Sequence, residues 1–225
     1  MNWSSGKDSA AALAAAREDP GLEVVGLLTT VNADADRVAM HAVRRSLLEL
    51  QADRLGLPLH VVEIPFPCPN QLYEEKMAAA IAEAATGDVG VFVFGDLYLE
   101  DVRAYRERAL AQTSVEPVFP LWGRRTNELA DEMIARGTRA ILTCVDLARL
   151  PASLAGRAFD AQLLADLPSD VDPCGERGEF HTFVWDGPGF DAPIDVENGE
   201  LVTRDGFAFR DVVPTPTGGT STRSD

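Results

Sequence analysis

A short polar loop near the start of the chain carries residues that could bind a phosphate. They are Ser4, Ser5, Gly6, Lys7, Asp8 and Ser9. This glycine-containing turn opens into a strong helix former over 10–16, which points free backbone N–H groups and the positive end of the helix dipole at one place. Lys7 adds a positive charge, while Asp8 would repel a phosphate unless it caps the helix or helps to hold a metal ion. The loop therefore predicts a phosphate site at a helix N-terminus.

The same loop resembles the SGGKDS signature of the PP-loop ATP pyrophosphatases, with Ser5 in place of the first glycine. It is not a Walker A loop, because the second glycine and the spacer before the Gly-Lys pair are missing. A match this short also fits an ordinary helix start that happens to carry serines and a lysine. Its place at the start of an alternating strand and helix pattern favours a nucleotide loop, because such folds put their phosphate site there.

Further candidates stand at the carboxyl ends of two expected strands. They are Thr29, Thr30, Gly95 and Asp96. Ligands of parallel sheets lie at that edge, so we expect these residues to converge on the phosphate loop. Thr29 and Thr30 are candidates to face the adenosine. Asp96 could hold Mg²⁺, which takes a few carboxylates with phosphate oxygens and water, although a loop or helix-cap carboxylate is an equally good interpretation.

Apolar periodicity predicts the elements that position these residues. The expected strands are 22–30, 59–64 and 89–94, and the expected helices are 10–17, 37–55, 71–85 and 101–111. Alternation over short connections predicts an α/β fold, a Rossmann-like parallel sheet with helices on both faces. Only Met1, Asn2 and Trp3 precede the loop, where a buried strand of about five residues is expected. The sequence therefore predicts either an unusually short first strand or a natural N-terminus upstream of Met1.

The second half of the chain has a different pattern. Residues 115–121, with two prolines, predict an edge strand, and 126–136 predict a helix capped by Thr126. Short strands are expected at 140–145, 180–185, 194–196, 200–203 and 207–212. We therefore expect a nucleotide-binding domain, a smaller C-terminal α+β domain and a disordered tail, over 1–112, 113–213 and 214–225.

Composition limits the partners of this 225-residue chain, whose 46% hydrophobic content can bury a full core. Twenty basic against 36 acidic residues give a formal net charge of −16, which opposes binding to a nucleic-acid backbone. Since the sequence shows neither an apolar run of roughly 18 to 20 residues nor a basic-then-apolar leader, it predicts a cytoplasmic protein without a membrane partner. Cys68, Cys144 and Cys174 are widely spaced, which predicts reduced thiols rather than a disulfide framework or a zinc site.

Four longer stretches widen the resemblance beyond the loop. They are MHAVRRSLLELQADRLGLPL (40–59), FGDLYLEDVRAYRE (94–107), LWGRRTNELADEMIARG (121–137) and DPCGERGEFHTFVWDGPGF (172–190). With the loop, they resemble the diphthine-ammonia ligase family, adenine-nucleotide alpha-hydrolase-like (HUP-type) proteins of the PP-loop class, over roughly 3–212. The GERGEFHTF block is the most specific element. The alanine-, arginine- and aspartate-rich composition gives the chain a bacterial character.

The resemblance implies ATP-dependent amidation of a carboxylate. ATP is cleaved between its α and β phosphates, the carboxylate takes AMP, pyrophosphate leaves, and ammonia displaces AMP. In eukaryotic and archaeal members the carboxylate belongs to diphthine on translation elongation factor 2, a target that a bacterium is expected to lack. The implied cofactors are ATP and Mg²⁺, the implied partners are ammonia and a carboxylate, and the identity of that carboxylate stays open.

The resemblance also implies roles for the polar residues. Lys7 would neutralise the leaving pyrophosphate. Glu176 and Glu179 would bind ammonium or orient the substrate. Without the resemblance, they would be interpreted as one exposed acidic turn that has no function. His181 would take a proton from the attacking ammonium, since only neutral ammonia is nucleophilic, although a lone histidine beside a strand is more often structural. Weaker candidates are His41, Arg103 and Arg106.

Two other functions compete with the ligase. A non-catalytic adenine-nucleotide-binding regulatory protein would keep the fold and the adenosine site, but it needs neither Lys7 nor the GERGEFHTF block. A PP-loop tRNA-modifying enzyme would have a basic surface and often paired cysteines, which the sequence does not offer. A homodimer stays open, since no pattern determines the oligomeric state.

Overall fold

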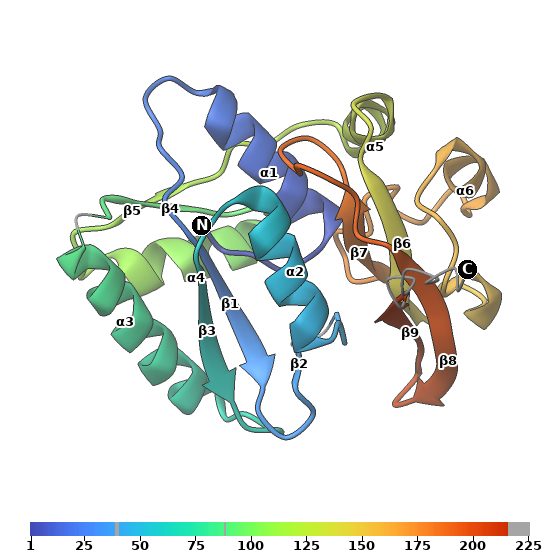
Figure 1. Ribbon diagram of the computed structural model, residues 1–225, viewed down its shortest axis with the longest axis horizontal. Helices are drawn as coiled ribbons and strands as arrows, with labels where there is room; N and C mark the ends of the chain where they lie inside the picture. Colours follow the sequence, from blue (N-terminus) through green and yellow to red (C-terminus); the bar gives the residue numbers. More distant parts are fainter. Residues whose placement is uncertain (39–40, 88, 216–225) are drawn as a thin grey trace, which may run out of the picture.

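The computed structural model describes residues 1–38, 41–87 and 89–215 (Figure 1). Its helices are α1 (Lys7–Glu18), α2 (Arg45–Leu55), α3 (Asn70–Thr86), α4 (Glu100–Leu110), α5 (Thr126–Ala135) and α6 (Ala161–Asp166), with a 3-10 turn over Ala152–Leu154. Its strands are β1 (Leu27–Asn32), β2 (Arg37–Val38), β3 (Leu59–Ile64), β4 (Val91–Val93), β5 (Glu116–Val118), β6 (Arg139–Asp146), β7 (Phe180–Asp186), β8 (Val196–Arg204) and β9 (Phe207–Pro214). The alternation of strands and helices predicted for the first half is confirmed.

The first half forms a parallel sheet with residues 1–3 at its centre. β1 pairs in parallel with β3, and β4 pairs in parallel with β5. Between these pairs, Trp3 donates its amide to the carbonyl of Leu28 at 2.8 Å, and Asn2 donates to the carbonyl of Val93 at 2.9 Å. The order across the sheet is therefore β3, β1, residues 1–3, β4, β5, with the short β2 pairing antiparallel to the end of β1 on the side away from β3.

Helices cover both faces of this sheet, as alternate residues of β1 show. Leu27 and Val31 belong to the core that contains the apolar residues of α1 and α2. Leu28 points the other way, into a core that includes Met77 of α3 and Leu110 of α4. Helices on both faces of the sheet are expected, because the strands of a parallel sheet are buried on both sides and are therefore almost continuously apolar. The predicted α/β fold is confirmed.

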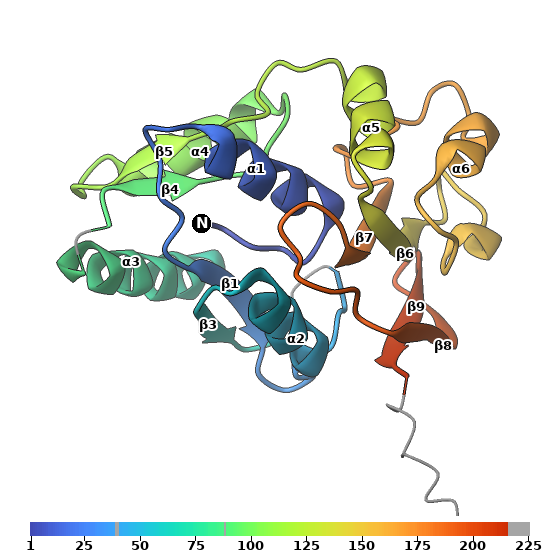
Figure 2. The ribbon, with the colours of Figure 1, turned by 45° about the horizontal axis from the view of Figure 1, so that its top comes forward.

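The second half adds an antiparallel sheet in the order β7, β6, β9, β8, which confirms a C-terminal α+β region. β7 lies beside the start of α1 in both views (Figures 1 and 2). β5 pairs with β4 and so completes the N-terminal sheet, while the division at residue 112 stays a prediction. The strands predicted at 194–196 and 200–203 join in β8. Most of the predicted disordered tail, 216–225, lies outside the described residues.

The segment before α2 differs from the prediction. Arg37–Val38 form β2 and α2 begins at Arg45, so the helix expected from residue 37 is wrong in its first part. Long-range pairing overrides the helical spacing. Val38 pairs with Val31 of β1, and Arg37 donates to Asp211 of β9 at 2.8 Å.

Two element boundaries also differ. β1 begins at Leu27 rather than at residue 22, because its pairing partner β3 begins only at Leu59. Thr126 is the first residue of α5, and Arg125 holds the cap position, so the prediction that Thr126 caps this helix is wrong. Both errors concern helix or strand ends, where local patterns are least informative.

Candidate active site

The phosphate loop turns sharply before α1 begins. Gly6 holds the cap position with extended dihedrals, while Ser5 adopts φ +68°, in the left-handed region where glycine is favoured. The Ser9 hydroxyl donates to the carbonyl of Gly6 at 2.9 Å and lies 3.0 Å from the Ser4 hydroxyl. Among the described residues, the buried Ser5 hydroxyl has no hydrogen-bond partner. The loop therefore combines a strained turn with a polar atom that the protein leaves unpaired.

Residues far apart in the sequence hold this loop in place. Val184 of β7 donates its amide to the carbonyl of Ser5 at 2.9 Å, and Lys7 donates its amide to the hydroxyl of Thr182 at 3.1 Å. The buried Gln51 amide donates to the carbonyls of Ser5 (3.0 Å) and Val184 (2.6 Å) and accepts from the Trp3 indole at 2.9 Å. Sequence reasoning missed Gln51 and Thr182, which lie inside the resembling stretches but match no chemical pattern.

The Lys7 side chain is almost fully buried, at 2% exposure. Its ammonium contacts both carboxylate oxygens of Asp8, at 2.8 and 2.9 Å, and donates to the carbonyl of Cys174. The Phe159 and Phe180 rings lie 5.4 Å away. Burial is the largest single effect and disfavours the charge, but the Asp8 carboxylate together with Cys174 and Glu176 outweighs it, and the pKa of Lys7 is raised. Lys7 therefore stays a cation and links the phosphate loop to the loop over 172–179.

Glu176 makes a second link across the site. Its carboxylate accepts from the amides of Leu97 at 2.8 Å and Tyr98 at 3.4 Å, in the loop that follows β4. Burial raises the pKa of Glu176 to about 7, and the charges of Asp8 and Asp96 act in the same direction. A carboxyl group with this pKa can exchange a proton near neutral pH.

Glu179 lies in the same loop but faces inward. Only 2% of the residue is exposed, and its oxygens accept from the amides of Asp172 (3.2 Å) and Arg177 (3.0 Å). Both oxygens are therefore occupied by the backbone of the loop that presents Glu176. These contacts favour a role in holding the loop.

Gly95 and Asp96 follow β4 and reach the phosphate loop as predicted from the sheet topology. A Cβ atom at Gly95 would lie 3.0 Å from backbone atoms of Asp8, so a larger residue there would push the start of α1 away by a few tenths of an ångström. The Asp96 carboxylate lies 3.6 Å from the Arg106 guanidinium, and burial raises the pKa of Asp96 despite that charge. The Asp96 oxygen in this ion pair, Oδ2, makes no hydrogen bond to the described residues.

The phosphate loop and the carboxylates beside it are compatible with a bound nucleotide that carries Mg²⁺. Mg²⁺ is usually bound by one or two carboxylates together with phosphate oxygens, and the Asp96 carboxylate would supply one of them, with its Oδ2 also lying 3.6 Å from the Arg106 guanidinium. Asp8 is the other carboxylate beside the loop. Within the described ranges, no cluster of three histidine, cysteine or carboxylate side chains forms a metal site by itself. A site at Asp96 would therefore depend on the nucleotide phosphates.

Two histidines lie side by side near the loop, with ring centroids 4.6 Å apart. His41 Nδ1 lies 3.1 Å from the carbonyl oxygen of Thr182, and a Cβ atom at Gly6 would lie 3.0 Å from the His41 ring. Burial lowers the pKa of His41 to about 4 and that of His181 to about 3, so both rings are neutral at pH 7. The sequence ranked His41 low, because its contacts are formed only in the folded chain.

The two threonines of β1 differ in their surroundings. Thr29 is 1% exposed, and its hydroxyl donates to the carbonyl of Trp3, which anchors the central strand. Thr30 points to the opposite face and is half-buried. Of the two, Thr30 is the one with an accessible surface.

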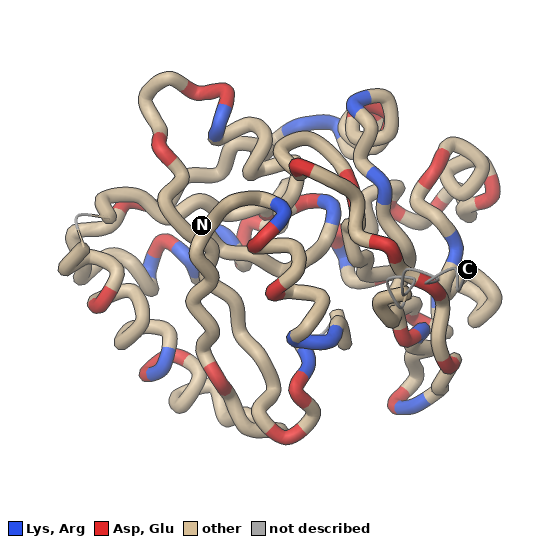
Figure 3. The backbone as a smooth tube through the Cα atoms, in the orientation of Figure 1, with Lys and Arg blue, Asp and Glu red and all other residues tan. Residues whose placement is uncertain are grey.

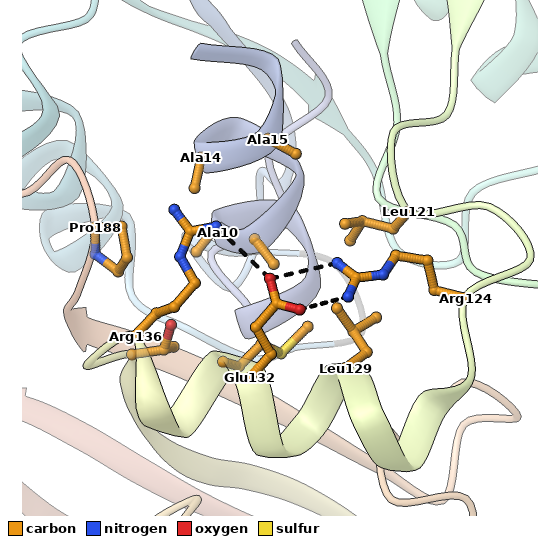
Figure 4. Close-up of a pocket in the computed structure, with 12 residues that line it drawn as sticks. Ala10, Ala14, Ala15, Leu121, Arg124, Leu129, Glu132, Arg136 and Pro188 are labelled. Atoms are coloured by element: carbon orange, nitrogen blue, oxygen red, sulfur yellow. Dashed lines mark hydrogen bonds and ion pairs between the residues drawn. The ribbon is translucent and has the colours of Figure 1, made fainter. Parts of the chain in front are cut away.

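A small cavity between α1 and α5 lies apart from this site (Figure 4). Its volume is about 30 Å³, which suits a water molecule and not a nucleotide. Glu132 lies between Arg124 and Arg136, with 3.6 Å to the Arg136 guanidinium. The three charges pair with one another, and we assign the cavity a structural role.

In the part of the chain that is described, no helix has the length and apolarity needed to cross a membrane.

Comparison with known proteins identifies the domains of the chain. The model of the diphthamide synthase N-terminal domain matches residues 1–116, and the model of its C-terminal domain matches residues 125–211. Human diphthine-ammonia ligase is 32% identical over 194 residues, which cover 80% of this chain and 73% of the human protein. The Danio rerio protein of the same name is 28% identical, with 80% and 76% covered.

The bovine diphthine-ammonia ligase is 33% identical over 120 residues, so that alignment spans 51% of this chain and 45% of the bovine protein. The relatives and the domain matches support an ATP-dependent, amide-forming ligase. The two domain models leave only a short connection between them and account for most of the chain. The chain therefore belongs to the diphthamide synthase family.

Proposed function

We propose that this protein adenylates a carboxylate with ATP, releases pyrophosphate and then forms an amide with ammonia. The observation that carries the proposal is the closure of the 172–179 loop onto the start of α1. Lys7 contacts the carbonyl of Cys174, and Glu176 binds the loop after β4. A phosphate loop and a second polar loop therefore meet in one site, which a ligase needs because two substrates must react there.

The ATP phosphates would lie against Ser4–Ser9 at the N-terminus of α1. The unpartnered Ser5 hydroxyl would donate to a phosphate oxygen, and Lys7 would stabilise the charge of the leaving pyrophosphate. Asp96, with Asp8, would hold Mg²⁺, which supplies positive charge to the phosphates when bound. Thr30 is the better of the two threonines to face the adenosine, since the Thr29 hydroxyl already bonds to Trp3.

Glu176 and the histidines would serve the ammonia step. As a carboxylate, Glu176 would bind ammonium and accept one of its protons, which its pKa of about 7 permits. We keep His181 as a candidate proton acceptor and add His41, while the lowered pKa values of both rings make them weaker bases than Glu176. Because the carbonyl of Thr182 can only accept, His41 Nδ1 carries the proton and His41 Nε2 is left free to accept one.

The relatives are named for diphthine and ammonia, and for this chain we propose the same bond change, carboxylate to amide, with free ammonia as the donor. The formal charge of −16 and the dispersed Lys and Arg segments (Figure 3) favour a substrate other than nucleic acid. The cytoplasmic location, the homodimer and the identity of the carboxylate stay predictions.

A non-catalytic nucleotide-binding protein is the second candidate. Incubation with Mg·ATP, ammonium and a panel of carboxylates, diphthine included, separates the two. The ligase should release AMP and pyrophosphate in equal amounts, dependent on the carboxylate. Tight ATP binding with no pyrophosphate from any member of the panel would favour the regulatory protein.

A further inference from the structure

Two arginines of α4 and three aromatic residues form a row at the carboxyl ends of β4 and β5, which we call the arginine–aromatic row. Phe94 follows β4, Phe119 follows β5, and their stacked rings have centroids 5.4 Å apart. The Trp122 ring extends the row, with its centroid 5.9 Å from that of Phe119. The guanidinium carbon of Arg106 lies 5.0 Å from the centre of the Phe94 ring. That of Arg103 lies 5.0 Å from the centre of Phe119 and 4.7 Å from that of Trp122.

The rings hold both guanidinium groups but leave most of their N–H groups available. Arg103 donates its Nε to Glu107 at 2.7 Å, and the Nε of Arg106 lies 3.6 Å from the Asp96 carboxylate. Within the described ranges, the terminal nitrogens of both arginines make no hydrogen bond. An aromatic contact holds a guanidinium plane without using its N–H groups, and this planar fork matches a carboxylate or a phosphate. The row therefore presents two prepared anion-binding groups.

Hydrogen bonds connect the arginine–aromatic row to the candidate active site. Gly123, beside Trp122, donates its amide to the carbonyl of Leu97 at 2.8 Å. Leu97 in turn donates its own amide to the carboxylate of Glu176 at 2.8 Å. Because the ligands of a parallel sheet lie at the carboxyl ends of its strands, the row adjoins the place where ATP and its co-substrate would meet.

The two arginines differ in their depth. Arg106 contacts Asp96 of the proposed nucleotide site and its side chain is 21% exposed, whereas the Arg103 side chain is 37% exposed. Residues three apart on a helix share a face, with about 5–6 Å between their Cβ atoms. A ligand that binds both guanidinium groups would therefore place one anionic group beside the nucleotide and a second anionic group nearer to the solvent.

On the basis of the ligase function given above, we propose that the arginine–aromatic row binds the acid substrate and that this acid carries at least two anionic groups. The carboxylate that becomes the amide would bind Arg106, where it would attack ATP with release of pyrophosphate. With Asp96 directed to Mg²⁺, the fork of Arg106 is left for this carboxylate. The second anionic group would bind Arg103, which would repel an acid that carries a cationic group there. A small dicarboxylate is the simplest acid of this class.

Three diacids, each paired with its monomethyl ester, test the second anionic group. Succinate, glutarate and adipate are titrated with Mg²⁺ and a non-hydrolysable ATP analogue present, so that binding is measured without turnover. The wild type should bind at least one diacid about tenfold or more tightly than its ester, because the ester leaves the fork of Arg103 without a charged partner. Arg103→Met should bind that pair equally, within about twofold. No preference of the wild type for any of the three diacids would overturn the proposal.

Arg108→Met is the matched control, since Arg108 is an exposed arginine in the last turn of the same helix. It removes the same charge from α4 and should keep the wild-type preference for the diacid. An equal loss of preference in Arg108→Met and Arg103→Met would show a general charge effect, which would also overturn the proposal.

The phosphates of ATP offer the same anionic chemistry, and titration with Mg·ATP alone separates the two sources. Arg103→Met and Arg106→Met should keep the ATP affinity within about threefold of the wild type, which also shows that both variants are folded. A loss of ATP affinity of tenfold or more in both variants, with the preference for the diacid unchanged, would assign the row to the nucleotide and overturn the proposal.

Pyrophosphate release with the preferred diacid and ammonium tests the ligase function separately from this subsite. Release by the wild type, with a KM for the diacid raised at least about tenfold in Arg103→Met, would support both. A diacid that binds through Arg103 without any release of pyrophosphate would contradict the ligase function and still support the anion subsite.

Discussion

The carboxylate of Glu176 accepts a 2.8 Å hydrogen bond from the backbone amide of Leu97. Leu97 lies two residues after Gly95, where an added Cβ atom would lie 3.0 Å from the backbone of Asp8 in the phosphate loop. One bond therefore couples the C-terminal loop to the strand end that supports the phosphate loop. Glutamine at position 176 would keep an oxygen that accepts this hydrogen bond but could not ionise. A Glu176→Gln variant therefore tests the charge of Glu176 while the hydrogen bond to Leu97 is kept.

Glu176→Gln should leave ATP affinity within about threefold of the wild type and reduce amide formation at least about 100-fold, the range expected for a lost acid-base group. Calorimetric titration and product assay measure the two effects. Glu179→Gln is the contrasting variant, since its amide would face two backbone donors and should cost about 1–3 kcal/mol of stability. Equal loss of ATP binding and of product in Glu176→Gln would move this loop into the nucleotide site.

The raised pKa of Glu176 also predicts a pH dependence of stability. Between the ordinary value of 4.5 and about 7 the folded state holds a proton that the unfolded state has lost. The contribution of this group is therefore fully present below pH 4.5 and is lost as the pH rises to about 7. Relative to Glu176→Gln, the wild type should lose about 2–3 kcal/mol over that window, measured by urea unfolding at pH 5 and 7.5. Parallel curves for the two proteins would contradict the assignment.

Ser5→Gly should stabilise the fold by about 1 kcal/mol, because Ser5 holds φ +68°. Ser5→Ala keeps that strain and removes only the hydroxyl. If the hydroxyl binds a phosphate, both variants should lose about tenfold in ATP affinity while only the glycine variant melts higher. Unchanged affinity in both would leave the Ser5 hydroxyl outside the phosphate site.

Gly95→Ala should weaken ATP binding about tenfold or more, because the added Cβ lies 3.0 Å from the backbone of Asp8 and displaces the loop. Gly90→Ala is the control, since a Cβ there meets nothing within 4 Å. Titration with Mg·ATP compares the two. Equal effects of both substitutions would show that the loop tolerates the displacement.

Local patterns predicted the elements that depend on nearby residues. The phosphate loop, the helix that follows it and the alternation of strands and helices were readable because turn chemistry and apolar spacing act over a few residues. The convergence of Gly95 on the loop followed from the rule that ligand sites lie at strand ends. The resemblance had already named Glu176 as a candidate. The structure adds the contacts by which Glu176 connects its C-terminal loop to the loop after β4.

Contacts between distant residues could not be predicted in the same way. Gln51 fixes the loop through Ser5 and Val184, and His41 reaches the carbonyl of Thr182, but neither side chain has a diagnostic spacing. The helix expected from residue 37 failed for the same reason, since Asp211 binds Arg37 from another sheet. Tertiary pairing overrides local propensity at such positions.

The most direct test is calorimetric titration with Mg·ATP of the wild type, Lys7→Met and Lys76→Met, with pyrophosphate assayed in the same samples. Methionine preserves the buried stem of Lys7 between its aromatic neighbours and removes the charge, while Lys76 lies on α3 away from the loop. We expect micromolar binding by the wild type and Lys76→Met, and at least tenfold weaker binding with no pyrophosphate from Lys7→Met. Equal binding and turnover by a folded Lys7→Met protein would contradict the assignment of this loop as the site of ATP cleavage.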